Sequence, residues 1–154
     1  MSDRDPLALE EQVCFALAVA SREVVAAYRS VLDPLGLTHP QYLVMLALWQ
    51  HAAAPDHDGL SVKDLSARLH LDPGTLSPLL KRLEAAGLVT RSRSTSDERV
   101  LTLGVTDEGH ALRRRALAVP ATMLSRLGMS EDDLTATNDV LRRIIDAAHE
   151  SVTA

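Results

Sequence analysis

The sequence predicts a mainly α-helical fold with a small β-hairpin, arranged as a winged helix-turn-helix with long outer helices. Three observations lead to this fold class. Two cap signatures between residues 61 and 86 begin helices that a short turn separates. Two short β-branched segments with a turn cluster between them follow directly, which is typical of a hairpin. Long helical patterns lie near both ends of the chain, and we expect them to pack against a second copy.

The first two helices are predicted in the N-terminal third of the chain. Residues 7–32 lack glycine and proline, and their apolar residues recur at steps of three and four, the pattern of a helix with one apolar face. The string "DPLGL" ends this helix. Thr38 then predicts an N-cap, with Pro40 in the first turn and Gln41 placed to complete a capping box. The second helix should run to about His51.

The next two helices form the predicted helix-turn-helix. Ser61 caps a short helix that ends near His70, and the turn "LDPGT" follows. Asp72 can cap the second of these helices, which ends at Gly87, a residue type suited to the position after a helix. Leucines at steps of three and four give that helix one core face.

Pro78 conflicts with a helix that starts directly after Asp72, because proline is comfortable only in a first turn. We therefore expect the regular helix to begin nearer Thr75 than Pro73.

The C-terminal half continues with a hairpin and further helices. The segments "LVTRSR" and "RVLTLGVT", separated by "STSDE", predict the hairpin. Thr106 caps the following helix, which Pro120 is expected to bend or interrupt. Ser130 caps a last helix that runs to about Glu150.

Composition limits the classes of protein that this chain can belong to. Its 154 residues, of which 46 % are apolar, suit one domain with a substantial core. No apolar run approaches the ~18 residues of a membrane span, and the polar, acidic start does not match a signal peptide. A single cysteine cannot form an intramolecular disulfide, so we expect the reducing cytoplasm. The scattered histidines lack metal-ligand spacing, so neither a metal nor a cofactor is expected.

The charge of the chain is unevenly distributed. A net charge of −5 argues weakly against a nucleic-acid ligand. Residues 61–106, however, contain seven basic and five acidic residues, so this segment carries +2 and the remainder carries −7. Arginines on a hairpin are usually solvated charges, but together with a helix-turn-helix they predict a DNA-binding face.

A recognition helix reads base edges in the major groove with outward residues near its N terminus. Thr75 and Ser77 can hydrogen-bond to bases or phosphate, whereas Pro73 and Pro78 offer only apolar contact. Asp72 caps the start of this helix, so the backbone N–H groups of the first turn should lie close to a phosphate. The candidates for contact with the bases are therefore Pro73, Thr75, Ser77 and Pro78, with Asp72 beside a phosphate.

Four basic residues are candidates for the phosphate backbone. Lys81 and Arg82 lie off the leucine face of the recognition helix. Arg91 and Arg93 alternate with Ser92, so both lie on one face of the first wing strand, toward the DNA backbone. Two lobes related by a two-fold axis would contact half-sites roughly one helical turn apart. The expected partner is therefore double-stranded DNA with an inverted-repeat operator.

The expected organisation is one domain that acts as an obligate homodimer. The domain covers residues 1–154. Within it, the dimerisation helices are at 7–36 and 107–154, and the winged helix-turn-helix lobe is at 61–106.

The string "LDPGTLSPLLKRLEAAGLVTRSRSTSDERVLTLGVTDEGHAL" resembles the recognition helix, wing and following helix of the MarR family of transcription factors. The pieces "LLKRLEAAGLVTR", "DER" and "LTLGVTDEG" match the family pattern, and the resemblance covers nearly the whole chain. It implies that Arg99 on the wing reaches the minor groove and that Asp97 braces it through an ion pair.

The N-terminal third is similar to the organic-hydroperoxide-sensing branch of that family. The strings are "QVCFAL", "SR", "YR" and "LDPLGLT-PQYLVMLALW". The resemblance implies that Cys14 is the peroxide sensor and that two tyrosines, from the partner subunit, hydrogen-bond its sulfur. The first tyrosine falls on Tyr28. The second is replaced by His39, since the branch usually reads "TYPQY" where this chain reads "THPQY"; Tyr42 matches the other tyrosine of that string.

The chemistry of these residues suits a redox switch. Only the thiolate attacks peroxide oxygen well, and both Tyr28 and His39 can donate a hydrogen bond to sulfur. Apolar neighbours would favour an organic hydroperoxide as inducer. Oxidation would give a sulfenic acid at Cys14, which a low-molecular-weight thiol could convert into a mixed disulfide because no second cysteine is present. Release of a repressor would follow from a change in dimer geometry.

Two other interpretations stay open. A lone cysteine in an amphipathic helix is usually a small core residue, and the regulator would then respond to a non-oxidising ligand such as a phenolic acid. A thiol peroxidase is disfavoured, because the chain has no resolving cysteine and lacks the strand-helix scaffold of such enzymes. We therefore predict a regulator and not an enzyme.

Overall fold

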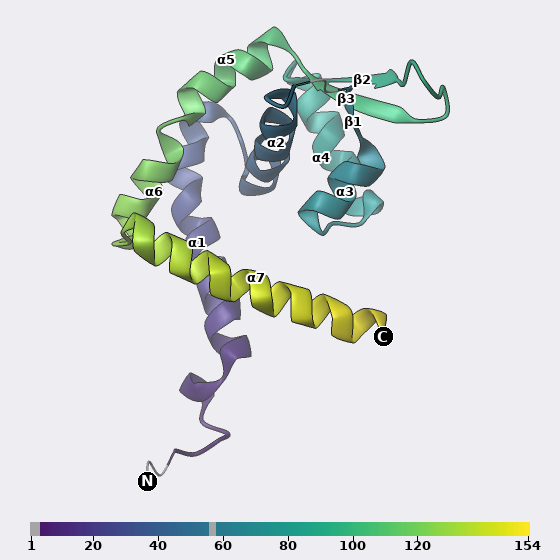
Figure 1. The fold of residues 1–154 in the computed structure, drawn as a ribbon. Coiled ribbons are helices and arrows are strands. Elements are labelled where there is room, and N and C mark those ends of the chain that lie inside the picture. Colours follow the sequence, from purple (N-terminus) through teal and green to yellow (C-terminus); the bar gives the residue numbers. More distant parts are fainter. Residues whose placement is uncertain (1–3, 56–57) are drawn as a thin grey trace. The chain divides into compact units, whose positions relative to one another are not determined.

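The computed structural model describes residues 4–55 and 58–154 (Figure 1). By its contacts the chain divides into two compact units, Met1–Leu117 and Ala118–Ala154. The observed elements confirm a mainly helical winged helix-turn-helix with a small sheet. Helix α5, Asp107–Ala116, is part of the predicted dimerisation segment 107–154 but lies in the first unit.

The chain enters the first unit through a 3₁₀-helix, Leu9–Glu11, and then helix α1, Val13–Leu32. The predicted helix from residue 7 thus begins later than expected. The reason is Gln12, whose backbone is extended and whose side-chain amide donates to the carbonyls of Pro6 (2.8 Å) and Ala8 (3.0 Å). A second 3₁₀-turn, Asp33–Leu35, follows α1.

Helix α2, His39–Ala52, begins with the predicted capping box. The Gln41 N–H donates to Thr38 Oγ1 (3.4 Å), and the Thr38 N–H donates to Gln41 Oε1 (3.0 Å). Helix α2 is the central element of the core, because most of its apolar side chains, including the single tryptophan Trp49, are buried.

The helix-turn-helix consists of α3, Val62–Leu69, and α4, Pro73–Ala85, with Ser61 and Asp72 as the predicted caps. Helix α4 begins at Pro73 and contains Pro78 in its interior, so the expected later start was wrong. The helix tolerates Pro78 because its core face still packs: Leu76, Leu80 and Leu83 are all buried. That packing offsets the loss of one backbone hydrogen bond.

The wing belongs to a three-stranded antiparallel sheet in the order β1-β3-β2. Strands β2, Val89–Arg93, and β3, Leu101–Val105, form the predicted hairpin, in register with Arg91 opposite Leu103. The short strand β1, Leu60–Ser61, was not predicted and pairs with β3. Two residues are too few to show the alternation of a strand in the sequence.

Helix α5, Asp107–Ala116, follows the sheet and is capped by Thr106, as predicted. The Thr106 hydroxyl accepts from the Gly109 N–H (3.0 Å) and donates to the Gly87 carbonyl (2.6 Å). Trp49 Nε1 donates to the Gly109 carbonyl at 3.0 Å in the core. These bonds fix the start of α5 to α2 and to the turn between α4 and β2.

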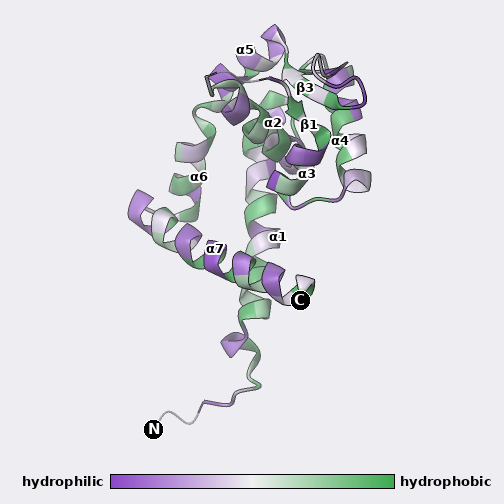
Figure 2. Cartoon of the chain, turned by 45° about the vertical axis from the view of Figure 1, so that its right-hand side comes forward, coloured by the Kyte–Doolittle hydropathy of each residue, from purple (hydrophilic) through white to green (hydrophobic). Residues whose placement is uncertain are grey.

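The second unit contains helices α6, Val119–Leu127, and α7, Glu131–Thr153. Pro120 stands in the first turn of α6 and so interrupts the helical segment after α5, as predicted. Ser130 caps α7 with a capping box. Helix α7 contains no buried residue over its whole length, and Figure 2 shows hydrophobic and hydrophilic residues on different faces of it. Within the described ranges, no helix is long and apolar enough to cross a membrane.

Candidate functional site

The N terminus of α4 presents an exposed group of predicted DNA contacts. Asp72, Pro73, Thr75 and Pro78 are exposed, and Ser77 is half-buried. One carboxylate oxygen of Asp72 accepts the Thr75 N–H and the other accepts the Thr75 hydroxyl, each at 2.9 Å. The backbone hydrogen bond from Thr75 is the main cause that lowers the pKa of Asp72. The helix start is therefore rigid, and it carries a fixed negative charge at its tip.

The side of α4 opposite the core carries two cations. Lys81 and Arg82 are exposed. Because the leucines of α4 are buried on the other side, these cations and the capped helix start belong to the solvent face of one helix. The leucine pattern predicted this face correctly from the sequence.

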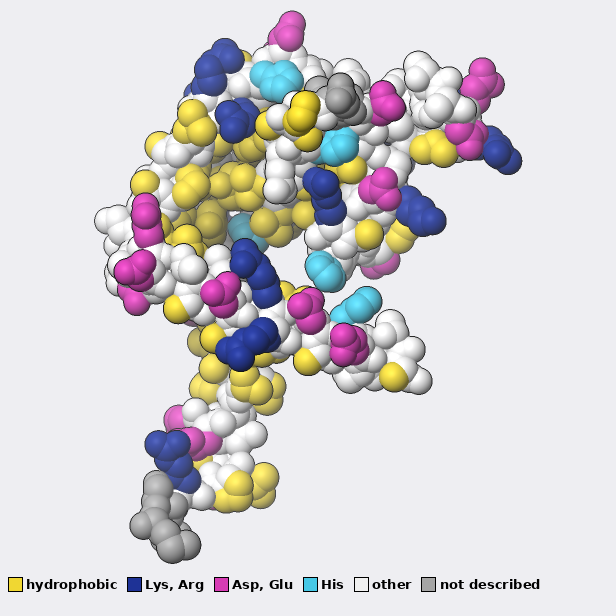
Figure 3. All heavy atoms as spheres, in the orientation of Figure 1, with side chains coloured by type: hydrophobic (Ala, Val, Ile, Leu, Met, Phe, Trp, Pro, Cys, Tyr) yellow, Lys and Arg dark blue, Asp and Glu magenta, His cyan; other side chains and the backbone are white. Residues whose placement is uncertain are grey.

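The tip of the wing carries an ion pair between Asp97 and Arg99. One carboxylate oxygen of Asp97 accepts both the backbone N–H (3.1 Å) and Nε (3.2 Å) of Arg99. The backbone hydrogen bond from Arg99 is also the main reason why the pKa of Asp97 is lowered. Figure 3 shows acidic and basic side chains together at this tip. The arginine side chain is 91 % exposed, so it stays accessible to solvent although it is paired with Asp97.

The two arginines of strand β2 have partners within the chain. Arg91 Nε donates to Glu84 Oε2 of α4 at 2.6 Å. Arg93 donates to the backbone carbonyl of Glu98 at 2.8 Å. Glu84 was not among the predicted site residues, and no signal in the sequence marks it, because its partner lies in another element.

Cys14 is an exposed free thiol in the first turn of α1. Tyr28 lies on the same helix about four turns later, roughly 21 Å away at ~1.5 Å per residue. A single chain therefore does not bring the predicted sensor together with its predicted hydrogen-bond donor.

The two predicted donors do lie together. The ring of Tyr28 is centred 5.1 Å from that of His39 and 5.8 Å from that of Tyr42. Burial raises the pKa of Tyr28 and lowers the pKa of His39. It also raises the pKa of Tyr42, with a smaller contribution from the charge of Tyr28. The cluster is therefore neutral around pH 7 and can donate hydrogen bonds.

A recess borders this cluster. It has a volume of about 280 Å³ and lies against the C-terminal half of α1 and the start of α2. Its walls are Val25, Arg29, Asp33, Leu37, Thr38, His39 and Pro40. The apolar part of this lining is Val25, Leu37 and Pro40, whereas Arg29, Asp33, Thr38 and His39 supply charged and polar groups.

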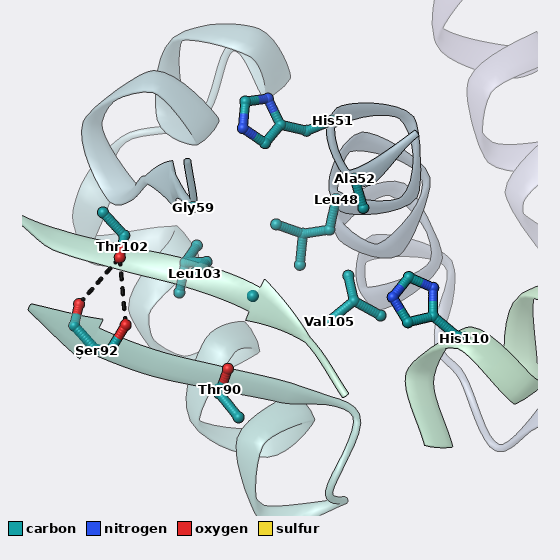
Figure 4. Close-up of a pocket in the computed structure, with 11 residues that line it drawn as sticks. Leu48, His51, Ala52, Gly59, Thr90, Ser92, Thr102, Leu103, Val105 and His110 are labelled. Atoms are coloured by element: carbon teal, nitrogen blue, oxygen red, sulfur yellow. Dashed lines mark hydrogen bonds between the residues drawn. The ribbon is translucent and has the colours of Figure 1, made fainter. Parts of the chain in front are cut away.

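A second cavity, of about 290 Å³, lies over the outer face of the sheet (Figure 4). The hydroxyls of Thr90, Ser92 and Thr102 line it, with His51 and His110 on its helical walls. The sequence does not predict this cavity, because its walls come from α2, the sheet and α5. In the part of the chain that the structure describes, no group of three or more ligating side chains could hold a metal.

Comparison with known proteins places the chain among transcription regulators. The profile of the MarR family matches residues 37–101. The organic hydroperoxide resistance transcriptional regulator of Bacillus subtilis is 40 % identical over 146 residues, which is 95 % of each chain. These relatives are regulators and not enzymes, as the sequence predicted.

Solved structures agree with this assignment. The repressor CouR, of Rhodococcus jostii, bound to a 23-mer DNA duplex, has a TM-score of 0.79 at 28 % identity, over 94 % of this chain and 99 % of CouR. Reduced AbfR, of Staphylococcus epidermidis, bound to DNA, has a TM-score of 0.72 at 28 % identity, over 94 % of both chains. The chain belongs to the MarR family of transcriptional regulators.

Proposed function

We propose that this regulator is a homodimeric repressor that leaves an inverted-repeat operator when an organic hydroperoxide oxidises Cys14. The identity with the Bacillus subtilis hydroperoxide regulator supports the choice of inducer. A structure of reduced AbfR on DNA supports the view that a reduced form binds the duplex. We place its action in the cytoplasm, where a reduced thiol and the duplex coexist.

The separation of thiol and donors within one chain is the observation that carries this proposal. Cys14 is exposed, whereas Tyr28 lies roughly 21 Å away along the same helix. The ring of Tyr28 lies beside that of His39, which lines a recess of mixed apolar and charged residues. An antiparallel pairing of two α1 helices would bring each thiol to Tyr28 and His39 of the partner subunit. Sensor and donors then form one site only in the dimer.

Oxidation proceeds in two balanced steps. The Cys14 thiolate attacks the terminal oxygen of the hydroperoxide, which forms an S–O bond and breaks the O–O bond. The alkoxide that leaves takes up a proton and becomes an alcohol, and Cys14 becomes a sulfenic acid. The sulfenic acid then condenses with a low-molecular-weight thiol, which forms a mixed disulfide and releases water. The added bulk at a contact between helices changes the separation of the two DNA-binding lobes.

The DNA contacts follow from the exposed groups of α4 and the wing. Thr75 and Ser77 face the bases, with Asp72, Pro73 and Pro78 beside them. Lys81 and Arg82 hold phosphates, and Arg99 enters the minor groove with Asp97 as its brace.

The test compares wild type with Cys14→Ser on the inverted repeat that wild type selects from a random duplex library. Cumene hydroperoxide with a small thiol should lower the affinity of wild type for this duplex at least roughly tenfold. The affinity of Cys14→Ser should stay the same. Intact mass should show the adduct on wild type alone. Equal responses of the two proteins, or none from either, would refute the sensing role.

A second candidate function is release by a non-oxidising ligand such as a phenolic acid. Its support is the relative CouR, which binds p-coumaroyl-CoA, together with the hydroxyl-lined cavity over the sheet. Thermal stabilisation by a panel of aromatic acids, unchanged after alkylation of the thiol, would favour this alternative.

A further inference from the structure

The ion pair between Glu84 and Arg91 joins the recognition helix to the wing. Glu84 lies in the last turn of α4 and Arg91 at the centre of β2, and the two elements are in contact. Their side chains are 42 % and 28 % exposed, and Nε lies 2.6 Å from the carboxylate oxygen. Arg99, in contrast, is almost fully exposed. The Arg91 pair is thus the more shielded of the two ion pairs in the wing.

The direction of Arg91 follows from strand alternation. Val89, Arg91 and Arg93 share one face of β2. Val89 is buried, so this face is directed toward the core and α4. Next along the face, Arg93 donates to the carbonyl of Glu98 in the loop of the wing. Arg91 therefore holds β2 to α4, and Arg93 holds the loop of the wing to β2.

We propose that Arg91 is a positioning residue, whose ion pair with Glu84 fixes the wing relative to α4, and that it does not bind a phosphate. This inference rests on the proposed DNA contacts of α4 and Arg99. Those contacts must reach neighbouring grooves at the same time, so the angle between helix and wing decides whether both form. A guanidinium paired with a carboxylate adds little net charge toward a polyanion, and the single bond from Nε to Glu84 Oε2 ties the strand to the helix.

The test measures duplex affinity at several salt concentrations for wild type, Glu84→Gln, Arg91→Gln and the double variant. The probe is the inverted repeat that wild type selects. If Arg91 is a positioning residue, each single variant should bind the duplex about fivefold more weakly than wild type, and the double variant no more weakly than either single one. The slope of log affinity against log salt concentration should stay unchanged. Arg91→Lys should recover most of the affinity, because lysine can still pair with Glu84. A phosphate contact instead predicts that Arg91→Gln lowers the salt slope by about 0.9 per protomer.

The decisive variant is Glu84→Gln. If Arg91 binds phosphate, removal of a neighbouring carboxylate leaves affinity unchanged or raises it, and either result overturns the proposal. Arg114→Gln, an exposed arginine of α5, is the matched control for the loss of one positive charge and should bind like wild type.

A measurement on the free protein separates this proposal from the proposed function. A nitroxide on Thr95→Cys, in a Cys14→Ser background, reports the mobility of the wing. Mobility should rise equally in Glu84→Gln and Arg91→Gln, and no change would refute the brace. Failure of wild type to select any duplex would refute the proposed DNA contacts, whereas the nitroxide result would still decide whether the ion pair holds the wing.

Discussion

His39 is a residue at which this chain departs from the branch that it resembles, because it stands in place of a tyrosine in the string "TYPQY". Its ring lies 5.1 Å from that of Tyr28, and burial lowers its pKa. A neutral imidazole has one N–H to donate, much as tyrosine has one O–H, so the substitution preserves a hydrogen-bond donor at neutral pH. Unlike tyrosine, His39 becomes a cation in acid, where it would stabilise a thiolate more strongly.

The rate of Cys14 oxidation should therefore fall less steeply with decreasing pH in wild type than in His39→Tyr. For a free thiol, whose pKa is about 8.5, the thiolate fraction falls about tenfold per pH unit below that value. Because burial lowers the pKa of His39 from 6.5, the two rate profiles should coincide above pH 6.5 and separate below it. Stopped-flow oxidation with cumene hydroperoxide gives both profiles. Curves that stay parallel in acid would show that His39 does not contact the sulfur.

Helix starts were the elements that the sequence predicted best. Thr38, Ser61, Asp72, Thr106 and Ser130 each accept the backbone N–H three residues later. A cap of this kind depends on four consecutive residues, so the chain itself contains the information. The outward face of α4 was predictable for the same reason, because its leucine spacing is local.

Features that depend on contacts between elements could not be predicted. Strand β1 forms because β3 lies beside it, and Gly59 lets the two approach, since a Cβ there would lie 2.9 Å from that of Thr102. The partner of Arg91 and the cavity over the sheet also depend on which elements become neighbours. Pro78 was misjudged because the packing of α4 against the core is stronger than the local preference against an interior proline.

At Gly109, replacement of glycine by alanine should destabilise the protein, although the same change usually stabilises a helix. In an open helix, Gly→Ala stabilises by about 1 kcal/mol. Gly109 lies where α5 meets the sheet, and a Cβ there would overlap the Leu88 carbonyl oxygen and lie 2.6 Å from Val105 Cγ1. Gly109→Ala should therefore lower the free energy of unfolding by about 1–3 kcal/mol.

Urea unfolding at fixed protein concentration measures this effect through the fluorescence of Trp49, which donates to the Gly109 carbonyl. Arg114→Ala, at an exposed position of the same helix, is the control and should change stability little. A Gly109→Ala protein as stable as wild type would mean that α5 can move away from the sheet at little cost.

At the scale of the whole molecule, helix α7 has an apolar face that we expect a partner to cover. It has 23 residues and none is buried, yet Leu134 and Ile145 are large apolar residues that remain 37 % and 46 % exposed. With Leu141 and Ile144 they lie on one helical face, whereas Arg143 points to the opposite side. Exposed apolar faces of this kind mark sites where another surface binds. We expect that surface to belong to a second copy of the chain.

Ile145→Asn tests this dimer in a way that also tests the operator geometry. If burial of Ile145 contributes about 1.5 kcal/mol in each of two copies, the substitution should raise the dimer dissociation constant roughly a hundredfold. Light scattering over a dilution series measures that shift, and Arg143→Asn, on the other face, should remain dimeric. Affinity for the inverted repeat should fall together with dimerisation, whereas affinity for a single half-site should stay the same, because each lobe still carries its own recognition helix and wing. If Ile145→Asn stayed as dimeric as wild type, α7 would not form the interface, and the geometry that links the thiol to the DNA would have to rest on α1 alone.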